Sequence, residues 1–132
     1  MGRLPVTIDD VLTSANSTTI AIAGNVTVYT KSWVWGQGEY WTLDYKATSD
    51  GTPGLKIEVE QGNTLPDTEG SSDTDWAVAS GASDVVSALA DETQHFAKLS
   101  PVVTRYGRLK ITGSSNHSST TLRAKLARQD EI

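Results

Sequence analysis

The sequence predicts an all-β fold, an antiparallel β-sandwich of the jelly-roll kind. Three observations lead to this prediction. Apolar and polar residues alternate along most of the chain, most clearly where Leu55, Ile57 and Val59 are interleaved with charged side chains. Glycine-containing turn signals, the strongest of them in residues 49–54, separate these segments. The sequence also lacks a long amphipathic helical pattern and an internal repeat.

Each expected strand shows the same period of two. The segments that carry it are 20–22, 26–29, 33–35, 40–47, 55–60, 76–78, 104–112 and 120–128. The last two of these are expected to form a hairpin through the loop 113–118, with Arg108 and Lys110 facing outward. Residues 83–91 could instead hold a turn of helix, because Ser83 or Asp84 can act as an N-cap.

The chain of 132 residues fits one domain. Residues 18–132 are predicted to form the sandwich, and residues 1–17 an extended N-terminal arm with a short strand near Val6 and Ile8. A frayed terminus is the alternative interpretation of the arm. The sequence contains no apolar run long enough for a membrane span and no signal-peptide pattern, so we expect no membrane partner.

The net charge of −5 is unevenly distributed. Residues 1–100 hold five basic and fourteen acidic side chains, whereas residues 101–132 hold six basic and two acidic ones. Such segregation favours acidic strands paired with basic strands, or a basic patch that docks on an acidic partner. Overall acidity, without aromatics between the basic residues, argues against nucleic acid.

No catalytic pattern is visible, and we expect no enzyme activity, no cofactor and no metal. The acidic segment 62–75 carries Asp67, Glu69, Asp73 and Asp75, but their spacing matches no calcium loop, so a solvated loop is expected. The two histidines have no zinc or triad spacing around them. Without cysteine, neither disulfides nor thiolate chemistry can contribute.

Aromatic and basic residues are therefore the candidates for binding. Trp33 and Trp35 either form an exposed platform for sugars or partners, or fill the core as Trp41 and Tyr45 are expected to do. For the basic residues, cross-strand pairing of Arg108 or Lys110 with Glu58 or Glu60 is the favoured interpretation.

Several segments resemble small structural proteins of tailed bacteriophages. They are YWTLDYKATSDG at 40–51, LKIEVEQ at 55–61, LPDTEG at 65–70, YGRLKITG at 106–113 and TTLRAKL at 120–126. The resemblance extends over about residues 38–129 and leaves the arm outside. It implies a β-sandwich of the virion, either a head decoration (cement) protein or a component of the neck or tail.

The resemblance also implies particular partners. A decoration protein would assemble in the host cytoplasm, contact the major capsid protein or other virion proteins, and self-associate as a trimer or dimer. The candidate partner-binding residues are Arg3, Leu4, Val6, Ile8, Trp33, Trp35, Arg108, Lys110 and Arg123. A carbohydrate-binding module, or a host-recognition component of the tail, is the alternative.

Overall fold

The computed structural model describes residues 7–10, 19–35, 40–49, 54–78, 85–89, 91–99, 104–114 and 119–129. The strands in chain order are β1 (Thr7–Asp10), β2 (Thr19–Ala23), β3 (Thr27–Tyr29), β4 (Trp33–Val34), β5 (Tyr40–Ser49), β6 (Leu55–Gly62), β7 (Ala77–Val78), β8 (Val86–Leu89), β9 (His95–Leu99), β10 (Tyr106–Gly113) and β11 (Ser119–Gln129). Their pairings are all antiparallel.

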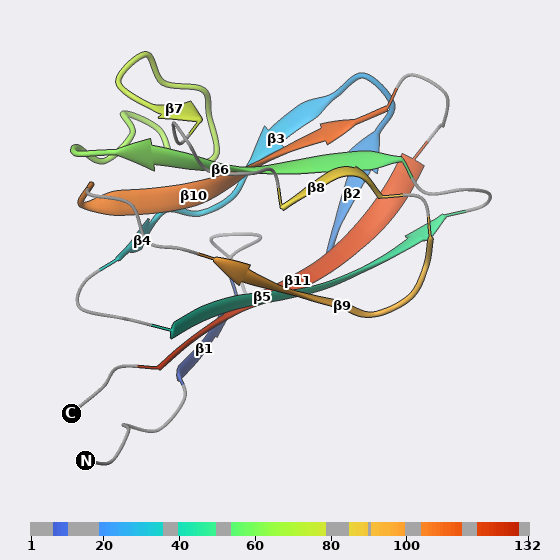
Figure 1. Ribbon diagram of the computed structural model, residues 1–132. Helices are drawn as coiled ribbons and strands as arrows, with labels where there is room; N and C mark the ends of the chain where they lie inside the picture. Colours follow the sequence, from blue (N-terminus) through green and yellow to red (C-terminus); the bar gives the residue numbers. More distant parts are fainter. Residues whose placement is uncertain are drawn as a thin grey trace.

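The strands form two sheets that lie one above the other (Figure 1). In the first sheet the order is β1-β11-β5-β9, and β2 also pairs with β11. In the second sheet the order is β3-β10-β6-β7, with β4 on β10 and β8 on β6. The chain changes sheets repeatedly, as from β5 to β6 and from β9 to β10 to β11. The predicted antiparallel β-sandwich is confirmed.

The core lies between the sheets and follows the predicted alternation. On β5, every second side chain from Trp41 to Ala47 is buried, and β6 buries Leu55, Ile57 and Val59 in the same way. The facing strands add Leu109, Ile111, Leu122, Ala124 and Leu126. Burying a large apolar side chain contributes about 1.5–3 kcal/mol, so this interior supplies the main drive for folding.

Three tryptophans close one end of the core. Trp35 packs edge-to-face between Trp33 and Trp41, with ring centroids 5.3 and 5.0 Å away. A Cβ added to Gly107 would lie 2.6 Å from the Trp35 ring, so glycine is what allows β10 to pass beneath these rings. Trp35 is only 2% exposed, which places it in the core.

The predicted hairpin between the two closing strands is wrong. β10 lies in the second sheet, where it pairs with β6 from Tyr106 to Gly113. β11 lies in the first sheet, where it pairs with β5 from Thr120 to Gln129. A polar connection of hairpin length also suffices to cross the sandwich from one sheet to the other. Alternation along a strand gives its inward face, but it does not show which sheet the strand joins.

The turn of helix suggested for residues 83–91 is also wrong over 85–89, the part of that range where the structure describes a continuous segment. Val86–Leu89 form β8, which pairs with β6 through an irregular register and buries Leu89. Val85 and Val86 pack against the core, and this β-branched pair suits a strand better than a helix. Across the described residues, no helix is long and apolar enough to cross a membrane.

Part of the predicted arm belongs to the first sheet. Residues Thr7–Asp10 form β1, and Ile8 is in register with Ala127 of β11 in the same chain. Arg3, Leu4 and Val6 lie outside the described residues, as does the residue 17–18 boundary between arm and domain, which stays a prediction.

Candidate functional site

Arg108 is the most buried charged side chain among the described residues. The pleat of β10 directs it to the outer side of the second sheet, as predicted, yet its exposed fraction is 0%. Its Nε donates to Glu60 Oε1 at 2.8 Å, and its Nη1 donates to the Ser71 carbonyl oxygen at 2.8 Å. The predicted cross-strand pairing of Arg108 with Glu60 is confirmed, and the segment between β6 and β7 covers the pair.

Two aromatic rings enclose the Arg108 guanidinium. Its Cζ lies 4.4 Å from the centroid of Tyr29 and 4.7 Å from that of Trp76, within the range of cation–π attraction. The Trp76 Nε1 donates to the Thr64 carbonyl oxygen at 2.9 Å. A Cβ on Gly62 would lie 2.6 Å from the Trp76 ring, so the indole packs directly on the β6 backbone.

The segment 63–76, which we call the acidic cover, is bonded to itself and to its neighbours. Glu69 accepts hydrogen bonds from the Ser32 hydroxyl and backbone N–H. The Asp73 carboxylate accepts hydrogen bonds from the backbone N–H groups of Asp75 and Asp67. These bonds, together with the charge of Arg108, lower the Asp73 pKa. Most of the segment is exposed to solvent, as expected of a solvated loop, and its bonds to Ser32 and Arg108 hold it over the second sheet (Figure 1).

The acidic cover directs most of its carboxylates to solvent. Asp67, Glu69 and Asp75 are exposed. Among the described residues, no group of three or more histidine, aspartate or glutamate side chains could hold a metal ion.

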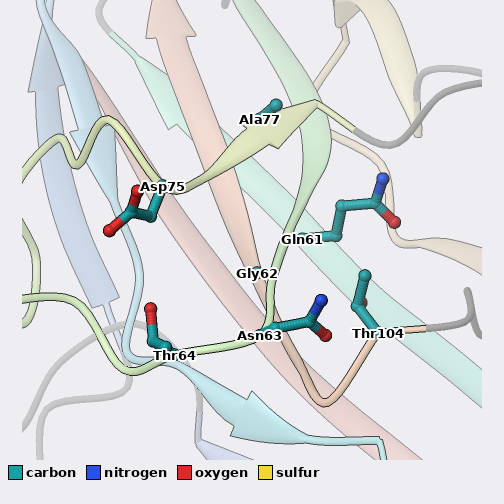
Figure 2. Close-up of a pocket in the computed structure, with 7 residues that line it drawn as sticks. All are labelled: Gln61, Gly62, Asn63, Thr64, Asp75, Ala77 and Thr104. Atoms are coloured by element: carbon teal, nitrogen blue, oxygen red, sulfur yellow. The ribbon is translucent and has the colours of Figure 1, made fainter.

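A shallow pocket of about 480 Å³ lies where β6 meets the acidic cover. It is lined by Gln61, Gly62, Asn63, Thr64, Asp75, Ala77 and Thr104. Gln61, Asn63 and Thr104 lie on one side of the β6 backbone, and Asp75 and Thr64 on the other (Figure 2). Amides, hydroxyls and one carboxylate can hydrogen-bond a polar ligand, and the Asn63 Oδ1 is already occupied by the Arg105 N–H at 3.1 Å.

A polar cluster stands at the start of β9, and the sequence interpretation missed it. Asp91 Oδ1 lies 2.7 Å from His95 Nε2 and 2.7 Å from the Thr93 hydroxyl, and it also accepts the Thr93 N–H. These bonds lower the Asp91 pKa to about 2, the Thr93 hydroxyl having the largest effect. The His95 ring stacks on Tyr45, whose pKa is raised by burial and then by the Asp91 charge. The spacing Asp-x-Thr, typical of an Asx turn, was the available signal.

The predicted partner-binding residues do not form one site. Trp35 and Arg108 are buried, so neither side chain is presented to a partner at the surface of this molecule. Trp33 and Lys110 are half-buried in the second sheet, and Arg123 is exposed on the first. Side chains inside β1, including that of Ile8, are not described.

Arg123 belongs to a surface that the sequence did not reveal. The outer side of the first sheet carries four basic side chains, which with Asp44 and Phe96 we call the basic face: Lys46, Lys98, Arg123 and Lys125. Arg123 is directly opposite Lys46, and Lys125 is opposite Asp44. Phe96, opposite Asp44 on β9, is 73% exposed. Only the strand register brings together residues so distant in sequence.

No protein-family model matches the chain, and no curated protein matches it. Similar solved structures include the carbohydrate-binding module CBM36 in complex with calcium and xylotriose, at 11% identity and a TM-score of 0.44, covering 96% of this chain and 100% of that one. The structure of infectious bursal disease virus strain Gx matches at 13% identity and a TM-score of 0.45, covering 98% of this chain and 34% of that one. The enzymatically active domain of tailspike protein 4 of bacteriophage CBA120 matches at 13% identity and a TM-score of 0.41, covering 97% of this chain and 18% of that one.

Replacing Arg108 with methionine tests whether its ion pair holds the acidic cover. The variant leaves the Glu60 carboxylate buried without its guanidinium, so we expect a loss of about 3–5 kcal/mol in the free energy of unfolding by urea denaturation. We also expect faster hydrogen exchange in residues 63–76. Adding Glu60→Gln removes the stranded charge and should recover part of the stability but not the slow exchange. Equal exchange rates in wild type and Arg108→Met would contradict this role.

The low pKa of Asp91 can be measured by carboxyl ¹³C NMR titration. We expect a pKa of about 2 in the wild type. Thr93→Val removes the hydroxyl donor and should raise this pKa toward 3.8, whereas Thr121→Val, on β11, should leave it unchanged. Because folding lowers this pKa, the stabilisation is present above pH 3.8 and is lost as pH falls through about 2. An Asp91 pKa near 3.8 in the wild type would be inconsistent with the cluster.

Proposed function

We propose that the chain is a non-catalytic structural protein of a phage virion, a head decoration protein that works through protein contacts. The observation that carries the proposal is the basic face, where the exposed cations Lys46, Lys98 and Arg123 stand beside Phe96, which is 73% exposed. Large exposed aromatics surrounded by charge are typical anchors of protein interfaces. The resemblance of residues 40–51, 55–61 and 106–113 to phage structural proteins supports a place in the virion.

The ionisable groups support a non-catalytic role. The Arg108–Glu60 pair is enclosed by Tyr29, Trp76 and the acidic cover, so a substrate cannot reach it. His95 bonds Asp91 at the surface and does not line the described pocket. A nucleophile, a base and a positioned binding space are needed together for catalysis, and the pocket formed by the described residues is lined by none of Arg108, Glu60 and His95.

Decoration requires many weak contacts that add up. Copies bound at neighbouring positions of a shell contact it simultaneously, so modest interfaces sum to lasting attachment. A rigid sandwich loses little conformational entropy on docking, since its strands are already ordered. We propose that these contacts involve the major capsid protein, and that the protein resides in the virion after assembly in the host cytoplasm.

Binding to undecorated heads of the source phage tests this function. We expect purified protein to co-sediment with the heads and to raise their melting temperature in calorimetry. Two variants should show which sheet contacts the shell: Arg123→Glu alters the first sheet, and Lys110→Glu alters the second. Arg105→Glu, which changes the net charge by the same amount, is the control. Failure of the wild type to bind heads, necks or tails would refute the proposal.

Glycan binding is a second candidate, favoured by the polar pocket of Gln61, Asn63 and Asp75. Burial of Trp35 removes half of the proposed Trp33–Trp35 platform, so the hydrogen-bonding groups of the pocket would have to supply recognition. On a glycan array we expect a hit that is lost in Gln61→Ala and retained in Trp33→Phe. An array without hits, or a hit insensitive to Gln61→Ala, would exclude this candidate.

A further inference from the structure

The basic face carries charge opposite to that of the protein as a whole. The net charge of the chain is −5, yet this face holds Lys46, Lys98, Arg123 and Lys125. The acidic residues in register with these cations are Asp44 of β5 and Asp10 of β1, both opposite Lys125. Lys46 and Arg123 are directly opposite each other on β5 and β11, where like charges destabilise a sheet. No salt bridge within the described residues neutralises any of the four. Such a face is suited to an acidic partner surface.

A matching acidic surface exists on the same molecule. The acidic cover, residues 63–76, has four carboxylates and no basic residue. It lies over the outer side of the second sheet, away from the outer side of the first sheet (Figure 1). The carboxylates of Asp67 and Asp75 accept no hydrogen bond from described residues. Only the backbone N–H groups of these two residues are bonded, and they donate to the Asp73 carboxylate. Leu65, also in this segment, is 59% exposed.

We propose that the basic face of one molecule docks on the acidic cover of a second copy. The two surfaces are complementary in charge, and each contributes an exposed apolar side chain, Phe96 on one and Leu65 on the other. Apolar burial supplies affinity in such an interface, while the opposed charges orient the partners and speed their association. This inference goes beyond the proposed function and does not depend on binding to a phage head. A molecule whose basic face is docked on another copy would contact a head through a different surface, and only a molecule at the free end of a row keeps its basic face for that contact.

The arrangement determines the symmetry of the contact. Because the basic face and the acidic cover lie on opposite sides of the sandwich, one pair of molecules leaves a free basic face at one end and a free acidic cover at the other. The contact is therefore head-to-tail, and it continues until the molecules close into a ring or form an open row. A dimer related by a two-fold axis would instead bring two basic faces together.

Two variants that each lose one surface test this directly. Lys46→Glu with Arg123→Glu inverts the basic face, and it replaces one like-charge cross-strand pair with another, so the fold should tolerate it. Asp67→Lys with Asp75→Lys brings the net charge of the acidic cover from −4 to zero without changing Asp73 or Glu69, whose side chains hold that segment. Arg105→Glu is the control: Arg105 is exposed, it lies outside the basic face, and only its backbone N–H bonds the acidic cover, at Asn63. Circular dichroism and thermal melts should confirm that every variant is folded.

Sedimentation velocity at low salt reports the assembly. We expect the wild type and Arg105→Glu to associate, and to do so roughly tenfold more weakly at high salt, since exposed charges are screened. Each double variant alone should be monomeric. An equimolar mixture of the two should form a 1:1 dimer, because only one intact basic face and one intact acidic cover remain to meet.

Other outcomes would overturn the proposal. A wild type that stays monomeric at low salt excludes self-docking, and binding of duplex DNA by such a monomer, lost in Lys46→Glu with Arg123→Glu, would assign the basic face to a polyanion instead. Association that survives in both variants points to a different interface. Variants that are monomeric alone and remain so when mixed would show that the two surfaces do not meet each other.

Discussion

The buried ion pair of Arg108 and Glu60 determines what covers the outer side of the second sheet. Its side chains point away from the core, where water would normally solvate them, so the chain had to supply another environment. The Ser71 carbonyl group and the rings of Tyr29 and Trp76 provide it. This requirement brings the acidic cover onto the sheet, and the position of the cover in turn creates the polar pocket and displays the carboxylates of Asp67 and Asp75 on that side of the molecule.

The local alternation of the sequence was sufficient for the sandwich and for the inward face of its long strands. It also allowed the pairing of Arg108 with Glu60, since both belong to strands with clear patterns. The burial of that pair was beyond prediction, because no periodicity shows that a polar loop folds back over a sheet. The predicted pairing of the two closing strands was wrong for a related reason. Adjacency in sequence favoured a hairpin, whereas each strand pairs with one that is distant in sequence, β10 with β6 and β11 with β5.

The candidate surfaces were predicted less well than the fold. Arg123 was recognised, but its neighbours Lys46 and Lys98 come from strands that lie far from it in sequence, so their proximity depends entirely on register. Trp35 could not be assigned because Val34 competes with it for the inward direction at the irregular end of β4. The Gly107 backbone settles this competition by leaving space for the indole ring.

One further consequence concerns β9, the last strand of the first sheet among the described residues. A sheet edge that displays an aromatic side chain invites strands of other molecules to add to it, which is how many β proteins precipitate. Lys98 follows Phe96 by two residues and therefore stands on the same side of this edge. A lysine at this position opposes stacking of identical edges, since two copies would bring like charges together. The same residue that contributes to the cationic surface thus also opposes irregular aggregation through this edge.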